Sequence, residues 1–372
     1  MEAVSLRELN RWTLARQHLL ARTEATPAAA VEALAGMQAQ APSAPYIGLW
    51  SRLVGFGVAD LEEALSQQAV VKTTVMRGTL HLVAATRLAA FRRATGSSYY
   101  DSTLRAMGEL GLDLEAIRAH VIAQVGGRPR SRTEVSRLVA EQVPPPHPVW
   151  LTDRPSAVAA LSVTTDLINS PEDAWFAAPV RSSYIVRRTD PVELQVAARQ
   201  VAGDYLAAYG PASAADLAAW SGRPARQLTE ALASLDLVRF KGPDGRNLLD
   251  LAGAPRPPAD TPAPVRFLPV WDSLLLAHAR RERVLGDGHR KLVIAKNGDV
   301  APTFLVDGVV AGTWALPPKA APRGAGPSAA PALTLRPLVP LPSVDKRAVA
   351  EEGRRLLAWL HPVTNAAVVW AR

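Results

Sequence analysis

The order of elements along the chain constrains its fold most strongly, because one arrangement recurs three times before residue 254. In the first copy, apolar residues at helical spacing predict four short helices, and the β-rich run 70–83, interrupted by Arg77-Gly78, predicts a hairpin. A capping box at Ser5 and a proline at the first helical position, Pro27, mark two of the helix starts. The four predicted helices span 5–20, 26–36, 44–54 and 60–68. Short helices followed by a two-stranded hairpin are the order of a winged helix.

The second and third copies follow the same order. The second ends in a strand-rich stretch over 175–188, and the third has a helix, a break at Gly210-Pro211 and a helix-turn-helix pair before its hairpin. The turn of that hairpin, residues 241–245, contains the glycine, proline and aspartate typical of tight turns. The predicted helices of these copies span 113–124, 131–142, 155–168, 192–209, 213–220 and 223–235, and the third hairpin pairs 235–240 with 246–251. We expect at least one copy to serve only as a scaffold.

A proline-rich connector over 255–264 leads to a different C-terminal part. Short strand-like runs separated by Asn-Gly-Asp and Asp-Gly turns predict a small antiparallel barrel, followed by an Ala/Pro/Gly loop, a helix and a last strand. The strand-like runs span 264–276, 291–314 and 332–341, the loop 317–331, the helix 345–360 and the last strand 365–370. The predicted fold is therefore α+β, with three tandem winged-helix units around a C-terminal antiparallel β-barrel. The predicted boundaries are 1–110, 111–190, 191–254 and 265–372.

Composition excludes several classes of protein. The chain is 48% apolar and 20% charged, as expected of a folded globular protein, and contains no run of about 18 apolar residues that could cross a membrane. The start of the sequence has acidic residues and no apolar signal core, so we expect a cytoplasmic protein. Cysteine is absent, and the seven histidines have no metal-ligand spacing, so we expect neither a metal nor another cofactor.

The formal net charge of +8 favours a polyanionic partner, because cationic side chains that contact phosphates release counterions. Only six of the 42 basic residues are lysines, however, and alanine and proline are abundant. This skew is also what the codon usage of a GC-rich genome would produce. Charge alone therefore leaves nucleic-acid binding and codon bias as equally good explanations.

Two glutamines, Gln38 and Gln40, form the one local pattern that suggests a site. Gly36 ends a predicted helix and Pro42 favours an extended conformation of the residue before it. Residues two apart in an extended chain point to the same face, whereas on a helix they diverge. Two amides could therefore converge on one water molecule, because each offers an acceptor oxygen and two N–H donors. The same pattern is also typical of a solvated polar turn.

Four motifs in this order and spacing resemble one bacterial family, the YcaQ/AlkZ-type winged-helix DNA glycosylases. The motifs are Gln38-Ala39-Gln40, Arg77-Gly78-Thr79-Leu80-His81-Leu82, the stretch 268–278 (LPVWDSLLLAH) and the stretch 306–314 (VDGVVAGTW). The resemblance covers nearly the whole chain. It implies a monomeric enzyme that acts on double-stranded DNA. The expected reaction is excision of N7-alkylated purines, including those in interstrand crosslinks of the azinomycin type.

The resemblance places Gln38 and Gln40 at the two polar positions of the family's active-site motif. Glutamine is a weak base and carries no charge, so the substrate must contribute a good leaving group, as a cationic N7-alkylguanine does. We therefore expect water positioning by the two amides, no action on uracil and a solvent-open site without a deep base pocket. Because no lysine lies near the motif in the sequence, we expect hydrolysis alone, without a Schiff-base lyase step.

Further residues are candidates for the same site. This chain has Trp271-Asp272 where the family usually has Phe-Asp, and Arg280 close to a position where the family often has an acid, so any role of that acid is in doubt here. We expect DNA contacts from Arg77, Lys241, Arg280, Arg281 and Arg283. Possible active-site neighbours are His81, Trp271 and Asp272.

Two other functions fit part of this pattern. Three winged helices and a positive charge describe a transcriptional regulator equally well, although a regulator would usually dimerise on a palindromic site. An architectural DNA-binding module would bind DNA in a salt-sensitive way without forming product. The feature that favours an enzyme is the Gln-Ala-Gln motif, because it lies outside every predicted recognition helix.

Overall fold

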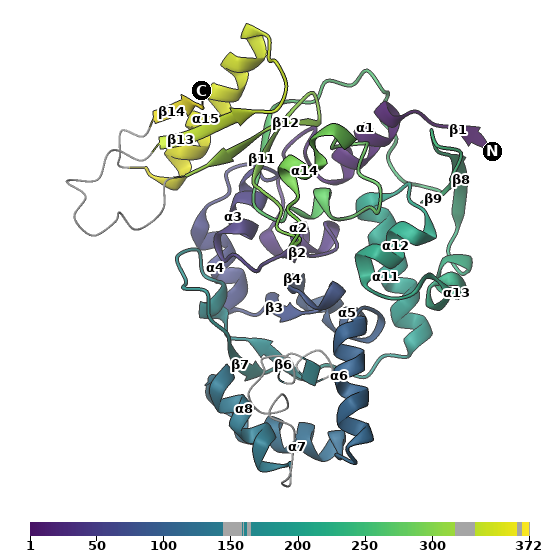
Figure 1. The fold of residues 1–372 in the computed structure, drawn as a ribbon, viewed down its shortest axis with the longest axis vertical. Coiled ribbons are helices and arrows are strands. Elements are labelled where there is room, and N and C mark those ends of the chain that lie inside the picture. The colour runs from purple at the N-terminus through teal and green to yellow at the C-terminus, as the bar shows by residue number, and fades with distance from the viewer. Residues whose placement is uncertain (144–157, 159, 162–164, 317–331, 363–366, 372) are drawn as a thin grey trace.

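A computed structural model describes the chain except for residues 144–157, 159, 162–164, 317–331, 363–366 and 372. Figure 1 shows helices gathered around four separate β-sheets, with the C-terminal sheet and its helix at one end of the long axis. The predicted 317–331 loop, half of the predicted 155–168 helix and the first residues of the predicted last strand lie outside the described residues. None of the described helices is long and apolar enough to cross a membrane.

The first unit, from α1 to α5, is built from short helices and a three-stranded sheet in the order β2-β4-β3. Ser5 and Glu8 form the predicted capping box at the start of α1, and Thr26 caps α2, whose first residue is Pro27. The hairpin turn is a single 3-10 turn in which Arg77 has a left-handed conformation. The elements are α1 (Leu6–Arg16), α2 (Pro27–Ala33), β2 (Met37–Gln38), α3 (Ser43–Trp50), α4 (Val58–Ser66), β3 (Val70–Thr74), β4 (Leu80–Ala84) and α5 (Leu88–Ala94).

The second unit, from α6 to β7, has a three-stranded sheet in the order β5-β7-β6. Ser131 and Glu134 form the predicted capping box of α8. Leu167 and Ile168, at the end of a predicted helix, instead belong to strand β6, where they pair with β7. The elements are α6 (Ser98–Glu109), α7 (Leu114–Val125), β5 (Arg130–Ser131), α8 (Arg132–Glu141), β6 (Leu167–Asn169) and β7 (Ser183–Val186).

The third unit, from α11 to β9, contains a strand from the other end of the chain. Strand β1 (Glu2–Ala3) lies parallel to β8, which forms the predicted hairpin with β9. A bridge between Ala212 and Leu249 extends the sheet on the opposite side. The elements are α11 (Leu194–Tyr209), α12 (Ala214–Ser221), α13 (Thr229–Ala233), β8 (Leu237–Lys241) and β9 (Asn247–Leu251).

The three units share a strand order. In each, a short segment before the hairpin pairs with the second hairpin strand: β2 with β4, β5 with β7, and Ala212 with Leu249. Two placements differ from the predicted boundaries: β1 belongs to the third sheet, and Met107 of α6 lies in the core of the second unit. The winged-helix assignment of the units stays a prediction.

The C-terminal part forms an open sheet, so the predicted closed antiparallel barrel is wrong. Its five strands follow the order β10-β11-β12-β13-β14, and within the described residues the first and last strands do not pair. The pairing of β13 with β14 is parallel, because helix α15 (Ser343–Leu360) runs between them and reverses the chain direction. The strands are β10 (Arg266–Leu268), β11 (Thr303–Val306), β12 (Val309–Ala315), β13 (Ala332–Pro337) and β14 (Ala367–Trp370), and a short helix, α14 (Arg290–Val293), precedes β11.

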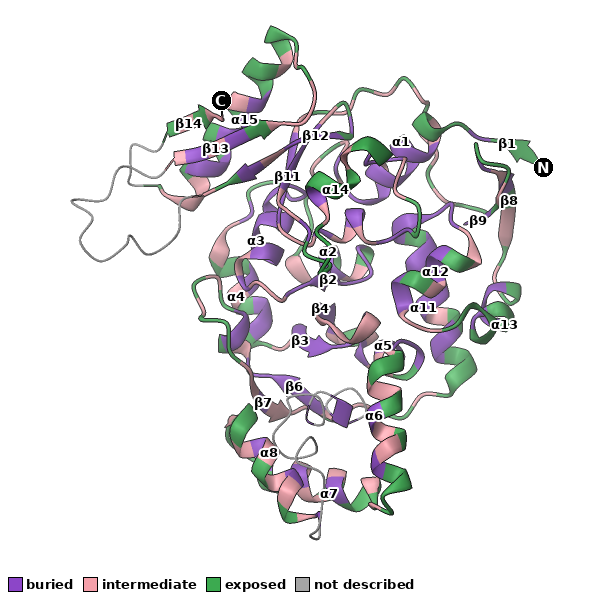
Figure 2. Cartoon of the chain, in the orientation of Figure 1, coloured by how far each residue is buried: buried purple, intermediate pink, exposed green. Residues whose placement is uncertain are grey.

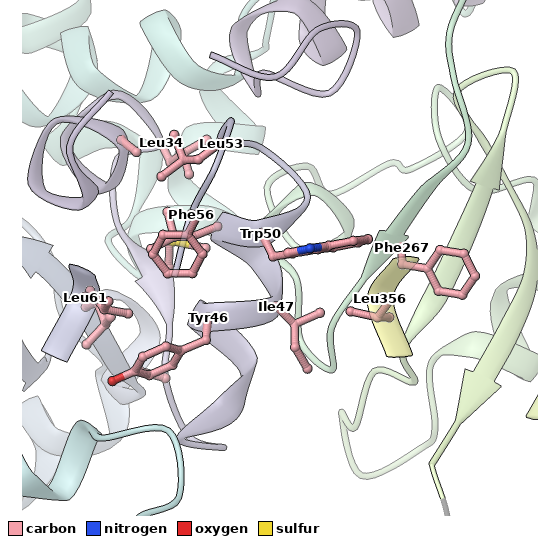
Figure 3. Close-up of a cluster of buried hydrophobic side chains, with 14 of the residues drawn as sticks. Leu34, Tyr46, Ile47, Trp50, Leu53, Phe56, Leu61, Phe267 and Leu356 are labelled. Carbon is pink, nitrogen blue, oxygen red and sulfur yellow. The ribbon is translucent and has the colours of Figure 1, made fainter. Parts of the chain in front are cut away.

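Buried residues follow these elements in several clusters (Figure 2). The largest joins the first unit to the C-terminal sheet, where Tyr46, Trp50 and Phe56 lie in one cluster with Phe267 and Leu356 (Figure 3). Helix α11 forms a second joint core with the first unit. The second unit has a cluster of its own. Hydrophobic burial therefore ties the first unit, the third unit and the C-terminal sheet together.

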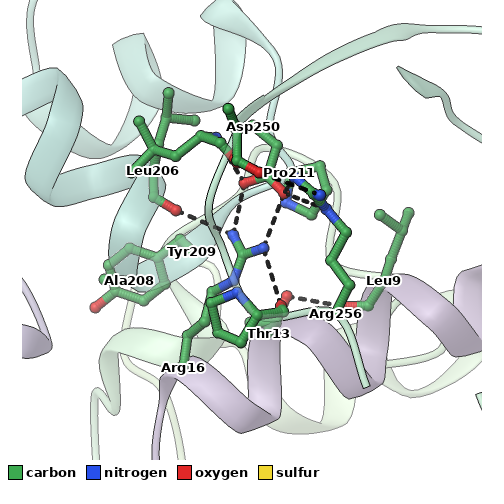
Figure 4. Close-up of polar contacts among 12 residues, drawn as sticks. Leu9, Thr13, Arg16, Leu206, Ala208, Tyr209, Pro211, Asp250 and Arg256 are labelled. Carbon is green, nitrogen blue, oxygen red and sulfur yellow. Dashed lines mark hydrogen bonds and ion pairs between the residues drawn. The ribbon is translucent and has the colours of Figure 1, made fainter. Parts of the chain in front are cut away.

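A buried ion pair also joins the first and third units (Figure 4). Arg16 of α1 binds Asp250 of β9 through both terminal nitrogens, at 2.7 and 2.8 Å, and its Nη1 also donates to the carbonyl of Leu206. Arg256 reaches the same carboxylate at 3.1 Å. Such two-point binding fixes the direction as well as the distance of the guanidinium. The ion pair therefore fixes α1 against the third unit.

Candidate active site

Gln38 and Gln40 lie where the chain passes from helix α2 through strand β2 to helix α3. Gly36, with a φ of 89°, lets the chain leave α2, and β2 then pairs with β4. The Nε2 group of Gln38 donates a hydrogen bond to Oε1 of Gln40. The two amides therefore converge as the extended backbone predicts.

The two glutamines differ in exposure. Gln38 is 7% exposed, and the Oε1 atom of its side chain has no hydrogen-bond partner among the described residues. Gln40 is only half-buried. A ligand approaching from solvent would therefore meet Gln40 first, with the carbonyl group of Gln38 behind it as an unused acceptor.

His81 lies directly across from Gln38 on the neighbouring strand. The backbone N–H of Ala39 donates to the carbonyl of Leu80, so Gln38 and His81 form a non-hydrogen-bonded pair, in which side chains approach most closely. Burial, reinforced by the charge of Arg77, lowers the pKa of His81 to about 3. Nδ1 lies 2.9 Å from the carbonyl of Thr79, which can only accept, so Nδ1 carries the proton of the neutral ring. The sequence-predicted neighbour is thus beside the motif, in its uncharged form.

Trp271 and Asp272 also lie beside Gln38, in the loop after β10. Together with Gln38 they line a small cavity between β2, the start of α3 and this loop. Trp271 holds a left-handed conformation with a φ of 53°, and the Asp272 carboxylate binds both terminal nitrogens of Arg52 at 2.9 and 3.0 Å. The structure therefore brings together residues more than 200 positions apart, as the resemblance implied.

This cavity is too small for a base. Its volume is about 10 Å³, close to the roughly 10–15 Å³ that holds a single water molecule. Trp271 is the one aromatic side chain among its lining residues in the described part of the chain. A closed aromatic cage is therefore not found beside Gln38 there. Among the described residues, no group of three His, Asp or Glu side chains is placed to hold a metal ion.

The expected DNA-contacting residues fall into two groups. Arg77 and Arg281 are half-buried and bond to carbonyl groups: Arg77 to Trp220 at 2.6 Å and Arg281 to Leu275 at 2.6 Å. Arg283 is 5% exposed and donates to Thr13 and Pro211. This burial contradicts the expectation that Arg283 contacts DNA, because its guanidinium is hydrogen-bonded inside the protein.

Lys241 and Arg280 form the second group, in which Lys241 is half-buried and Arg280 is exposed. Lys241 ends strand β8 at the third hairpin turn, where its Nζ lies 3.3 Å from the carbonyl of Gly245. Arg280 has a side chain 55% exposed and pairs at 2.9 Å with Asp244 of that same turn. The third hairpin and the loop after His278 thus form one charged surface.

Three residues near the site were not predicted from the sequence. Arg52 and Gln17 contribute polar groups to the cavity, and Arg52 is almost fully buried. A charged residue inside the apolar run after Leu49 is a signal that could have indicated a buried ion pair, although not its partner. Lys72 is in the same sheet as Gln38, on β3, and β4 lies between its strand and β2. Its Nζ is buried among residues of the opposite face and donates to the carbonyl of Asp173 at 2.8 Å, and burial lowers its pKa to about 8.

Comparisons with known proteins agree on one family. A family model described as DNA glycosylase AlkZ-like matches residues 31–359. A curated protein of Streptomyces sahachiroi, named interstrand DNA cross-link repair glycosylase, is 27% identical over 340 residues, covering 83% of this chain and 87% of that protein. The solved structure of Streptomyces sahachiroi DNA glycosylase AlkZ has a TM-score of 0.78 and 22% identity, covering 99% of this chain and 100% of that one. That structural likeness shows a shared fold.

Proposed function

The chain belongs to the AlkZ-like DNA glycosylases, and from that premise we propose that it hydrolyses the N-glycosidic bond of cationic N7-alkylated purines in duplex DNA. Gln38 and Gln40 position the attacking water in this proposal. The observation that carries it is the contact between the two amides, which leaves the buried Oε1 of Gln38 as an unpaired acceptor beside the more accessible Gln40.

The chemistry of two neutral amides limits the substrate. A general base typically contributes about 10²–10⁴ in rate, equivalent to about 3–5 kcal/mol, and glutamine supplies little of this. An N7-alkylated purine carries a positive charge and leaves as a neutral base. The added water gives its oxygen to C1′ of the sugar and one proton to solvent. Orientation of that water and of the sugar is then the main task of the protein.

The substrates include purines within interstrand crosslinks. A crosslinked purine cannot rotate freely out of the duplex, so an enzyme that releases it needs an open site. The absence of an aromatic cage around Gln38 in the described residues and a cavity no larger than one water molecule support this proposal. The curated relative is named for interstrand DNA cross-link repair.

Hydrolysis proceeds without a covalent lysine intermediate in this proposal. Lys72 lies in the same sheet as Gln38, but its amino group donates to the carbonyl of Asp173 in the protein interior. Lys241, Arg280 and Arg281 hold the flanking DNA, since they remain at least partly accessible. The protein acts as a monomer. Family membership favours this enzyme over the alternative of a tandem winged-helix transcriptional regulator.

The proposal predicts that base release depends on both glutamines. Duplexes containing N7-methylguanine are incubated with wild type, Gln38→Ala, Gln40→Ala and the double variant under single-turnover conditions, and released base is measured. We expect each single variant to lose about 10²-fold or more, because misplaced water costs that much, and the double variant to approach the spontaneous rate. A uracil duplex should give no release with any of them.

The matched control is Gln67→Ala. Gln67 is an exposed glutamine of the first unit, and its side-chain amide donates to the carboxylate of Glu63 on the surface. The variant should release N7-methylguanine at the wild-type rate. Release by the double variant at the wild-type rate would refute the catalytic role of the motif. Trapping of a protein–DNA adduct with borohydride would refute the monofunctional mechanism.

A further inference from the structure

Among the described residues, two buried polar atoms without hydrogen-bond partners belong to residues that line the small cavity beside Gln38. One is the Oε1 acceptor of Gln38 and the other is the Nε–H donor of Arg52, and both residues line the cavity. Among the described residues, neither atom has a hydrogen-bond partner. Buried polar groups are nearly always hydrogen-bonded, to protein or to ordered water. An unpaired donor and an unpaired acceptor at one cavity therefore call for a ligand that can both accept and donate.

The size of the cavity identifies that ligand. A volume of about 10 Å³ leaves room for a single water molecule and for nothing larger. A bound water also needs two or more polar partners, and Arg52 and Gln38 each bring one unpaired polar atom, while the polar residues Asp272 and Ser273 line the same cavity. The site therefore meets both requirements of an internal water site.

The guanidinium of Arg52 is held rigidly at this place. Its terminal nitrogens donate to the Asp272 carboxylate at 2.9 and 3.0 Å, and Nη1 also donates to the carbonyl of Gly48 at 2.9 Å. Arg52 and Asp272 are 1% and 4% exposed. With both terminal nitrogens fixed by the protein, Nε is the nitrogen left to bind another group.

We propose that one water molecule in this cavity accepts a hydrogen bond from Nε of Arg52 and donates one to Oε1 of Gln38. Arg52 is then a positioning residue that acts on Gln38 through the water. The bridge holds the carbonyl end of the Gln38 amide toward the cavity and its Nε2 toward Gln40, so that rotation of the amide by a half turn would break both contacts. The role of Arg52 in catalysis rests on the proposed function of Gln38.

The test compares two buried arginines, one of which lines the cavity while the other does not. Arg52→Lys keeps a positive charge for Asp272 but removes the Nε–H group. Arg16→Lys is the matched control, since Arg16 is equally buried, binds Asp250 through both terminal nitrogens and also has an unpaired Nε, yet does not line the cavity. We expect Arg52→Lys to lower the single-turnover rate of N7-methylguanine release about 10-fold or more at unchanged Kd for the duplex. Arg16→Lys should keep the wild-type rate.

A double-variant comparison separates this inference from the proposed function. Arg52→Lys added to Gln38→Ala should cause no further loss, because residues that act through one another are not additive. If Gln38→Ala is inactive while Arg52→Lys matches wild type or Arg16→Lys, the positioning role is wrong and the proposed function stands. If Gln38→Ala is fully active, both fail.

A crystal structure of the wild-type protein tests the water site even if Arg52→Lys does not fold. Density for one water within about 3.2 Å of both Arg52 Nε and Gln38 Oε1 is expected. A cavity without ordered density, or a direct contact between these two groups, would overturn the proposal.

Discussion

Individual residues of the candidate site are neutral where charge would be the usual choice. Gln38 and Gln40 are amides where a carboxylate could activate water, and burial together with the nearby charge of Arg77 lowers the pKa of His81 and keeps its ring uncharged. The charged groups nearby are engaged with one another, as Arg52 is with Asp272. Such an environment does not repel the positive charge of an alkylated purine, because the described residues place no unpaired cation at the two amides.

The neutral state of His81 predicts an acid-dependent loss of stability. Its pKa is about 3 in the folded protein and 6.5 in a model peptide, so between these values the unfolded chain binds a proton that the folded chain does not. Stability contributed by the neutral ring is therefore complete above pH 6.5 and is lost as the pH falls toward 3. The expected slope is about 1.36 kcal/mol per pH unit within this window.

Urea denaturation of wild type and His81→Asn from pH 7.5 to pH 4 measures this contribution. Asparagine can still donate to Thr79 but cannot take up a proton, so the free energy of unfolding should fall less steeply with acid in the variant. Parallel curves for the two proteins would show that His81 titrates alike in both states.

Sequence reasoning reached some of these residues and not others, for a physical reason. The Gln-Ala-Gln motif was accessible because both amides and the backbone that aligns them lie within seven residues. Trp271 and Asp272 came from the family resemblance. Arg52 was missed because its partner is Asp272, 220 residues away, and no local pattern reports a long-range ion pair.

At the scale of elements, the third hairpin is the best-placed cationic surface. Its turn is tied to the loop after His278 by the pairing of Arg280 with Asp244, and Arg246 joins the same carboxylate. Lys241 lies at the base of this turn with only a 3.3 Å contact to a carbonyl. A lysine held so weakly can move to a phosphate at little cost, since it gives up no ion pair among the described residues.

The hairpin therefore predicts a measurable salt effect. Lys241→Ala should weaken binding to any duplex to a similar extent and lower the slope of log Kd against log salt by about one. Fluorescence anisotropy at several salt concentrations measures both. Lys346→Ala is the control, because Lys346 is an exposed lysine on α15 in the C-terminal sheet region, far from the hairpin in Figure 1. Equal slopes for Lys241→Ala and wild type would remove this hairpin from the DNA interface.

Most of the observed helices were predicted, but α5, α6 and α14 were not, and neither were the partners of the strands beyond the hairpins. Caps such as Ser5, Ser131 and Ser213 mark helix starts through local hydrogen bonds, and all three are observed. The closed barrel was wrong because alternating apolar residues indicate a strand without indicating which strand lies beside it. Parallel pairing of β13 with β14 depends on how α15 packs, which is a tertiary property.

At the scale of the whole molecule, the units are not equally connected by apolar contacts. Joint cores connect the first unit with both the third unit and the C-terminal sheet. The second unit packs largely on itself, through residues such as Met107, Val121 and Val139. Its apolar links to the first unit are a small cluster around Val71, Leu88 and Ile168 and the packing of Ala174 and Phe176 in the largest cluster. Because most of the apolar contacts of the second unit are internal, we expect it to be less stable than the part that the joint cores hold together.

This division predicts that the second unit opens before the rest. Hydrogen exchange followed by mass spectrometry in low denaturant should show α7 and α8 exchanging at a denaturant concentration that leaves α11 protected, because α11 lies in a joint core. Gln38 and Gln40 would remain in the stable part. Simultaneous exchange of all three helices would mean that the chain unfolds as one unit.

The pairing of β1 with β8 also has a consequence for biosynthesis. Residues 2–3 are made well before their partner strand, Leu237–Lys241, which follows roughly 230 residues later. At about 5–20 residues per second, the ribosome needs roughly 10–50 s to supply it. Until then, Leu9 and Trp12 of α1 lack Phe240, against which they pack in the finished protein. The growing chain therefore exposes the apolar side chains Leu9 and Trp12 of the amphipathic helix α1 for many seconds before the strand that covers them is made.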